Sequence, residues 1–338
     1  MQTLLKTTQA YQLLKTERED ARLGHAYLLL FNDSKNLRFA LKTFAKLFFS
    51  CENFCENSYE ISRENSDNDD AKKARISKLI DTETFSDCLF FPLDGKKLTV
   101  EDAEKIQEES TLNPVEGDKK LFVIGDFAEA NVQTQNKLLK LLEEPPKGVQ
   151  FLLGATTVFP VLPTVLSRTK KLEIQPFDVD KLTECLFRLY GDKYTRETLT
   201  LCAATSGGSV GEAQRILDGG YYKTLMDNAF ALAQANPARL PALARQVGET
   251  KYQKELLSLL RILFRDALLI KTQGKNAEKS LMLRSQRAVL TILAEKYTLS
   301  ALFFAQEAIS EAEKQVRFNA VFPQCIELCI ANIQAKNK

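Results

Sequence analysis

Short apolar runs without polar alternation recur between residues 24 and 177, and segments with helical periodicity separate them. Continuous apolar strands are typical of sheets covered on both faces, and alternation of strands with helices favours parallel order. The sequence therefore predicts a doubly wound, largely parallel α/β sheet in this region. Its expected strands are HAYLLLF (25–31), Leu89 to Pro92, KKLFVIGDF (119–127), VQFLLGATT (149–157) and KKLEIQPF (170–177).

Helices are expected between and before these strands. Apolar spacing predicts one helix over Leu4 to Leu14 and another from Leu37 to Phe49. Thr99 is an N-cap residue before a turn with acidic side chains, which the positive end of a helix dipole favours. A further helix, Val132 to Leu142, ends before Pro145-Pro146 because proline cannot continue a helix, and we interpret its leucines as packing residues.

Residues 56–75 are acidic, rich in Asn and Ser, and poor in apolar side chains. Such a segment buries too little apolar surface to join a core, so we expect a mobile insertion without a chemical role. Cys51 and Cys55 stand just before it. A structural zinc site needs four ligands, but the next cysteine is Cys88 and the single histidine is His25. We interpret the cysteine pair as helix-end thiols and predict no metal.

After Phe177 the strand signals stop, and helical segments ended by glycine follow. We expect a small helical domain over 178–220 and a second all-helical domain over 221–338. The α/β domain then covers residues 1–177.

The composition excludes several classes of protein. The 338 residues contain 46 Lys plus Arg against 44 Asp plus Glu, a formal net charge of +2. This near balance argues against an autonomous nucleic-acid binder, which needs a strong positive field. The start lacks a signal-peptide pattern and no apolar run is long enough to span a bilayer, so we expect a cytoplasmic protein. Seven scattered cysteines indicate reduced thiols rather than a disulfide framework.

The most specific block is NKLLKLLEEPPKGVQFLLGATTVFPVLPTVLSRTKKLEIQPF, residues 136–177. It resembles the sensor-1 and Ser-Arg-Cys region of the AAA+ clamp-loader family, above all its bacterial delta-prime subunits. The segments RLGHAYL near the start and LRILFRDALLIK near the end are similar to the same family. The resemblance implies an AAA+ module followed by a small helical lid domain and an all-α collar domain.

The resemblance places residues 31–38 where the family's ATPases carry the phosphate loop GxxxxGKT. That loop needs glycines so that backbone N–H groups can wrap the phosphates, a lysine to neutralise them, and a hydroxyl for magnesium. We interpret the remaining cations, Lys35 and Arg38, as solvated turn charges. The positions of the glycines, the lysine and the hydroxyl are occupied by Phe31, Asn36, Leu37 and Arg38.

Two further parts of the implied ATP site are degenerate. Active relatives end a buried strand with an acidic pair, but here Gly125 replaces the metal-facing aspartate and Asp126 the water-activating glutamate. A lone Asp at a strand end is most simply a turn or helix cap. In the lid, the arginine that touches phosphate in active relatives is Gly211. The resemblance therefore implies that the chain binds no nucleotide cofactor.

Arg168, within the sequence LSRT, matches the arginine that family members project toward the ATP of a neighbouring subunit. A guanidinium suits this task because it is always charged and can bind two phosphate oxygens at once. The resemblance implies that Ser167 and Arg168 form an arginine finger acting in trans. The alternative is an ordinary solvated arginine beside Lys170 and Lys171. Thr169 stands where the family has its cysteine.

The implied function is that of a delta-prime subunit of the DNA polymerase III clamp loader, which loads the sliding clamp onto primed DNA. Its expected partners are gamma or tau ATPase subunits and the delta subunit, with the clamp and primer-template DNA met through the complex. Two alternatives stay open. One is a gamma- or tau-like subunit that binds and hydrolyses ATP, and the other is a DNA-binding module acting alone.

Overall fold

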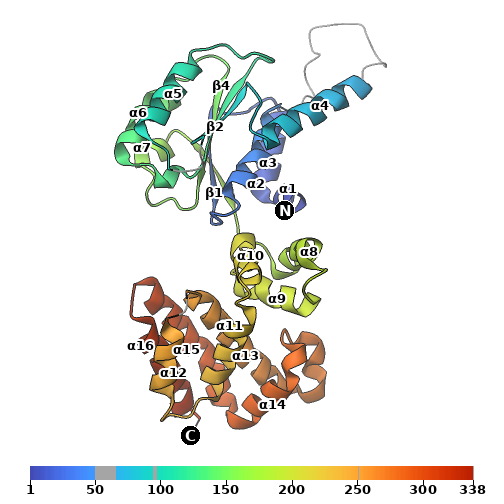
Figure 1. Cartoon of the computed structure of the whole chain (residues 1–338), viewed down its shortest axis with the longest axis vertical. Helices are drawn as coiled ribbons and strands as arrows, with labels where there is room; N and C mark the ends of the chain where they lie inside the picture. The colour runs from blue at the N-terminus through green and yellow to red at the C-terminus, as the bar shows by residue number, and fades with distance from the viewer. Residues whose placement is uncertain (50–65, 94–96, 250, 338) are drawn as a thin grey trace. The chain divides into compact units, whose positions relative to one another are not determined.

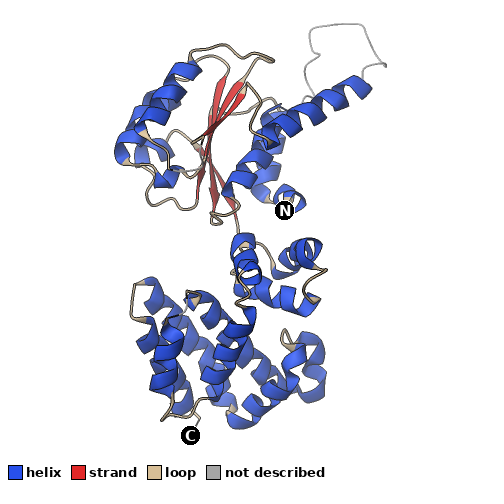
Figure 2. Cartoon of the chain, in the orientation of Figure 1, coloured by secondary structure: helices blue, strands red, loops and turns tan. Residues whose placement is uncertain are grey.

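The computed structural model describes residues 1–49, 66–93, 97–249 and 251–337, which fold as two compact units, Met1–Pro176 and Phe177–Lys338 (Figure 1). All of the described strands lie in the first unit, and the second unit is helical (Figure 2). The predicted division into domains over 1–177, 178–220 and 221–338 stays a prediction.

The first unit contains a five-stranded parallel sheet in the order β2-β3-β4-β1-β5, which confirms the predicted α/β class. Its register pairs Leu28 with Leu153 and Phe122 with Phe151. The three central strands are buried along their whole length, as continuous apolar runs require. The strands are β1 Ala26–Phe31, β2 Cys88–Phe91, β3 Lys120–Ile124, β4 Val149–Ala155 and β5 Lys170–Ile174.

Helices cover both faces of this sheet (Figure 1). Thr99 closes a capping box with Asp102 at the start of α5, as its position in the sequence predicted. A 3-10 helix, η1 (Phe127–Glu129), follows β3. One face carries α1 Gln2–Lys6, α2 Gln9–Glu19, α3 Leu37–Phe49 and α4 Ser66–Asp81, and the other carries α5 Val100–Ser110, α6 Val132–Glu143 and α7 Pro163–Leu166.

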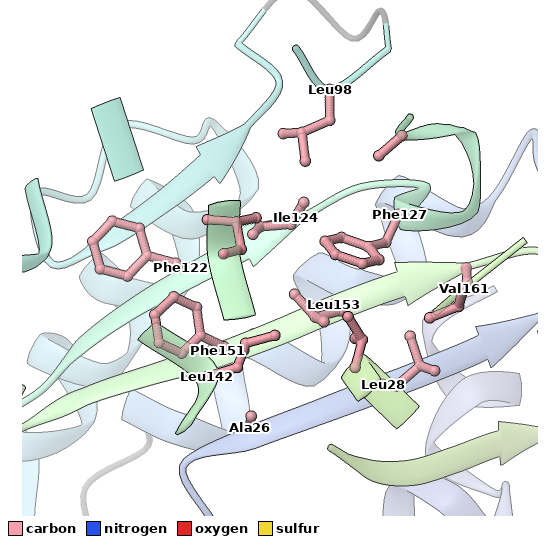
Figure 3. Close-up of a cluster of buried hydrophobic side chains, with 14 of the residues drawn as sticks. Ala26, Leu28, Leu98, Phe122, Ile124, Phe127, Leu142, Phe151, Leu153 and Val161 are labelled. Atoms are coloured by element: carbon pink, nitrogen blue, oxygen red, sulfur yellow. The ribbon is translucent and has the colours of Figure 1, made fainter. Parts of the chain in front are cut away.

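A buried aromatic row crosses the sheet beneath the second of these layers. Phe122 and Phe151 stack with ring centroids 5.5 Å apart, and Phe91 extends the row at 6.4 Å from Phe122. Leu142 of α6 and Ile124 of β3 belong to the same cluster (Figure 3). Burial of each large apolar side chain contributes about 1.5–3 kcal/mol. This core therefore fixes the carboxyl ends of the strands, and the residues of the candidate site follow those ends.

The predicted helix over Leu4 to Leu14 is wrong in one respect, because the segment forms two helices. Thr7 Oγ1 donates to Leu4 O at 2.8 Å, and Thr8 Oγ1 accepts from the backbone N–H of Tyr11 at 3.2 Å. Threonine side chains compete with the helical hydrogen-bond ladder in this way. The two threonines end α1 and cap α2.

The predicted insertion over 56–75 is wrong for residues 66–75, which belong to α4. Residues 56–65, like Cys51 and Cys55, lie outside the described residues. The carboxyl-terminal part of α4 buries Ile76 and Ile80, and Asp81 pairs with Lys46 of α3 at 2.6 Å. Helix formation is cooperative, so this anchored end supports a polar stretch that has no apolar face of its own.

The second unit packs around α13, which runs for 21 residues and contacts α11, α14 and α15. Its buried Asp266 accepts the backbone N–H groups of Met282 and Leu283 at 2.8 Å each, which fixes the connection to α14. Within the described ranges no single helix is long and apolar enough to cross a membrane; only Arg284–Lys296 and Leu299–Arg317 pass that test together, with a bend of 108° between them. The helices are α8 Val179–Tyr190, α9 Arg196–Thr205, α10 Val210–Asp218, α11 Tyr222–Gln234, α12 Leu240–Gly248, α13 Gln253–Gln273, η2 Gly274–Ser280, η3 Arg284–Gln286, α14 Arg287–Lys296, α15 Leu299–Arg317 and α16 Phe322–Ala335.

Candidate functional site

The carboxyl ends of β1, β2, β3 and β4 meet at one edge of the sheet, which is where ligands bind in open α/β folds. Residues 31–38, which the resemblance places at the position of the phosphate loop, run from the last residue of β1 into the first turn of α3. Within it, the buried carboxylate of Asp33 accepts from Asn36 N at 3.2 Å and from Asn36 Nδ2 at 3.0 Å. The loop therefore encloses a carboxylate of its own, and a carboxylate repels the phosphates that such a loop binds in an ATPase.

Arg38, in the first turn of α3, reaches across this edge to a glutamate that lies 45 residues away in the sequence. Its Nε donates to Glu83 Oε1 at 2.9 Å and its Nη2 to Glu83 Oε2 at 2.5 Å, a bidentate pair. Its Nη1 donates to the carbonyl of Pro92 at 3.1 Å, and the guanidinium lies over the ring of Phe90. The prediction of a solvated turn charge is therefore wrong for Arg38, which is half-buried and paired.

Glu83 is the centre of a small charge cluster. Besides Arg38, it has Lys42 of α3 at 2.8 Å. The hydrogen bond from Arg38 is the main reason that the pKa of the Glu83 carboxyl falls from its ordinary 4.5 to about 2. The carboxylate is thus ionised at neutral pH and holds both cations at the edge of the sheet.

Gly125 follows β3 beside this cluster. Its backbone N–H donates to Phe91 O at 2.8 Å. A Cβ at this position would lie 3.5 Å from Arg38 Nη1. The guanidinium therefore stands next to the point from which a metal-facing carboxylate would extend in an active relative. A fixed cation at this place repels a divalent metal.

Asp126 follows with φ of +24° and begins η1 without a side-chain cap. Its carboxylate instead accepts from Thr156 Oγ1 at 3.2 Å and from Thr156 N at 3.3 Å, which ties the end of β3 to the end of β4. Burial is the main cause that raises the pKa of this carboxyl. The residue therefore links the ends of two strands and makes no side-chain cap on η1, which differs from the cap that its sequence position predicted.

No three His, Cys, Asp or Glu side chains gather to hold a metal ion within residues 1–49, 66–93, 97–249 and 251–337. The cysteines of those ranges are free and buried. They are Cys88, Cys185, Cys202, Cys325 and Cys329.

Gly211 stands where the resemblance implies the arginine of a lid domain. Gly211 is a buried residue in the first turn of α10, in the second unit. Ser209 caps that helix by accepting from Glu212 N at 3.3 Å. A glycine offers no side chain with which to contact a phosphate.

Arg168 follows α7, and Ser167 is the C-cap of that helix. The guanidinium Nη1 donates to Thr164 O at 2.8 Å and to Ser167 Oγ at 3.2 Å. The Nη2 atom lies 2.5 Å from Glu143 Oε1 at the end of α6, and one third of the Arg168 side chain is exposed. Ser167 thus contributes a hydrogen bond to the arginine, and the arginine is both oriented and accessible.

Sequence reasoning missed the two glutamates that pair with these arginines. Glu143 lies in the LLEEPP segment of the family-like block, so its place close to the motif was a usable signal. Glu83 follows α4 in a segment without any motif, with φ of +57°, and only the fold brings it to the sheet edge.

Comparison of the sequence with known proteins identifies the family of this chain. The model for the family described as DNA polymerase III, delta subunit, matches residues 6–178, slightly more than half of the chain. The delta' subunit of Bacillus subtilis (strain 168) is 28% identical over 165 residues, which are 49% of this chain and 46% of that protein. The gamma subunit of Buchnera aphidicola subsp. Baizongia pistaciae is 24% identical over 143 residues, 41% of this chain and 39% of that protein.

The tau subunit of Escherichia coli (strain K12) is 28% identical over 127 residues, 37% of this chain and 20% of that protein. The chain therefore spans less than half the length of each of these relatives. A solved gamma subunit-related protein of Thermotoga maritima aligns with a TM-score of 0.40 at 15% identity, over 96% of this chain and 99% of that one. With the delta subunit model matching more than half of its length, the chain belongs to the DNA polymerase III delta subunit family of AAA+ clamp-loader proteins.

Proposed function

We propose that the chain is a non-hydrolysing delta-prime subunit of a clamp loader, and that it lends Arg168 to the ATP site of a neighbouring subunit. The observation that carries the first half is the Arg38–Glu83 pair, because a guanidinium stands where the phosphate loop of an ATPase has its magnesium-binding hydroxyl. The same edge lacks the metal-facing carboxylate at Gly125.

The charges at this edge oppose a triphosphate. Asp33 is a buried carboxylate inside the loop, and Glu83 is ionised at neutral pH. Arg38 offers little compensation because it makes four contacts within the protein: Nε and Nη2 donate to Glu83, and Nη1 donates to the carbonyls of Phe91 and Pro92. A nucleotide would have to displace these hydrogen bonds and approach two anions, without glycines that allow the backbone to wrap it.

Arg168 has the opposite character, which supports the second half of the proposal. It follows a short helix, its side chain is one third exposed, and it lies outside residues 31–38. An arginine presented to a neighbouring subunit stabilises the charge that spreads over a transferring phosphoryl group. The proposed partners are gamma or tau ATPase subunits and the delta subunit, with the sliding clamp and primer-template DNA contacted through the complex.

Reconstitution of the loader tests this proposal. The complex should hydrolyse ATP and load the clamp faster with the wild-type chain than with the Arg168→Ala variant, while both chains co-purify equally with the other subunits. Equal turnover by the two complexes would refute the finger. Failure of the wild-type chain to co-purify with those subunits would refute the clamp-loader role itself.

One observation favours a second candidate, a gamma- or tau-like subunit with an ATP site of its own. Relatives with those names match about as well as the delta' relative does, at 24–28% identity. This candidate requires saturable binding of ATP by the isolated chain. An autonomous DNA-binding module has no such support, since the net charge is +2, and it would require salt-dependent DNA affinity from the isolated chain.

A further inference from the structure

The surroundings of Arg168 contain a carboxylate that the proposed finger does not by itself require. Glu143 Oε1 lies 2.5 Å from Arg168 Nη2, while Nη1 donates to Thr164 O and to Ser167 Oγ. These contacts use three of the five N–H donors of a guanidinium. Two donors remain for the oxygens of a phosphate, so the carboxylate orients the side chain without exhausting it.

The elements that present the two side chains are fixed to each other by one buried residue. Gln135 of α6 is 1% exposed, and its Nε2 donates to the carbonyls of Ala130 and Pro160 at 3.0 Å each. Its Oε1 accepts from Leu162 N, immediately before α7, at 2.9 Å. The helix that carries Glu143 and the helix that precedes Arg168 are therefore held in register, and the pair is built into the fold.

Helix electrostatics point to a specific reason for this pairing. Glu143 is the last residue of α6, where the helix dipole disfavours a carboxylate, and Glu144 follows it. Arg168 places a cation against Glu143 at this helix end, in addition to Lys140 in the last turn of α6. The adjacent cations have other partners, since Lys170 pairs with Glu17 and Lys171 pairs with Glu173.

We propose that Glu143 is the positioning residue of the arginine finger. By holding Nη2, it keeps the guanidinium in the orientation in which it meets a neighbouring subunit's phosphate, so that less side-chain ordering remains to be done on assembly. This inference rests on the proposed function of Arg168. A carboxylate that merely competed with phosphate for the arginine would have the opposite effect on the reaction rate.

The test uses the loader complex, assembled with ATPase subunits of which only the one facing this chain keeps its phosphate-loop lysine. Glu143→Ala should lower kcat by about tenfold and change KM for ATP by less than about twofold, because positioning acts on the transition state. Glu143→Gln keeps an acceptor and should lose no more than about threefold. Glu173→Ala removes a similarly exposed ion pair on β5, Lys171–Glu173 at 2.8 Å, and should leave turnover unchanged.

A double variant separates positioning from other roles. If Glu143 acts through Arg168, the complex with Glu143→Ala and Arg168→Ala together turns over as slowly as the one with Arg168→Ala alone. An additional loss in the double variant, or unchanged or faster turnover with Glu143→Ala, would overturn the inference. Loss of turnover with Arg168→Ala but not with Glu143→Ala removes only this inference, whereas a silent Arg168→Ala removes the proposed finger with it. Thermal unfolding of Glu143→Ala should match the wild type, since exposed ion pairs contribute little to stability.

Discussion

Two arginines of the first unit each pair with a glutamate, and their surroundings differ. Arg38 has both oxygens of Glu83, a backbone carbonyl and an aromatic ring around it, and its side chain and that of Glu83 are about one quarter exposed. Arg168 binds one carboxylate oxygen of Glu143 at the end of α6, and two of its five N–H donors remain for a ligand. We propose that the same chemical pair serves stability at Arg38 and presentation to a partner subunit at Arg168.

The largest expected effect comes from the exposed arginine. Arg168→Lys keeps the charge but loses the planar fork that binds two phosphate oxygens, so hydrolysis at the partner's site should fall by about 10²-fold or more. Single-turnover hydrolysis by the reconstituted loader measures this. Thermal unfolding of the isolated chain should not change. A lysine variant as active as the wild type would mean that Arg168 supplies only general positive charge.

Substitution of Arg38 should instead lower the stability of the isolated chain. Arg38→Ala leaves Glu83 with Lys42 as its remaining cation, and we expect a loss of about 2 kcal/mol in the free energy of unfolding. Denaturant unfolding measures it, with Lys35→Ala in the exposed part of the same loop as control, expected within about 0.5 kcal/mol of the wild type. An unchanged stability in Arg38→Ala would contradict the structural role, and so would acquired ATP binding without any loss of stability.

The pH dependence of stability tests the Glu83 cluster. Its folded pKa lies below the unfolded value, so its contribution is present above about pH 4.5 and is lost as the pH falls toward 2. Allowing for solvent screening of a partly exposed pair, Glu83→Gln should cost about 1–2 kcal/mol at pH 7 and progressively less at pH 4 and pH 3. Glu116→Gln, which removes the partner of the exposed Arg75, serves as control. If the difference in unfolding free energy between Glu83→Gln and the wild type stayed constant with pH, the proposed contribution of this cluster to stability would be contradicted.

The smallest effect is expected at Asp126. Burial raises the pKa of its carboxyl, which means that its charge is a cost to the folded state, and asparagine retains an acceptor for Thr156. Asp126→Asn should therefore leave the free energy of unfolding unchanged or raise it by less than about 1 kcal/mol, and should leave clamp loading unaffected. A marked loss of loading would show that Asp126 retains a catalytic role.

Much of the fold followed from local patterns. Uninterrupted apolar runs such as LFVI at the end of β3 have few ways to be buried other than in a parallel sheet, and Thr99 and Pro145 mark helix ends by local chemistry. The failures were also physical. Thr7 and Thr8 divide a helix through side-chain hydrogen bonds, and α4 buries Ile76 and Ile80 and pairs with α3 at its carboxyl-terminal end, contacts that the composition of 56–75 does not predict.

The candidate site, like the fold, could be predicted from the sequence only in part. Resemblance to the family singled out these three positions: Arg168 lies in the family-like block 136–177, and Arg38 and Gly125 stand where the family's phosphate loop and acidic pair are expected. It did not reveal what Arg38 does, since Glu83 reaches it only through the packing of α4 on α3. Charged residues in a loop look solvated in a sequence until the fold supplies a partner.

Calorimetric titration of the isolated chain with ATP and magnesium tests whether the chain binds nucleotide at the edge of the sheet where Arg38 pairs with Glu83. We predict no saturable heat up to millimolar ATP, because Arg38 and Glu83 remain bound to each other at the edge of the sheet. Saturable binding with a micromolar Kd that is lost when residues 31–38 are altered would contradict this view and favour a gamma- or tau-like ATPase.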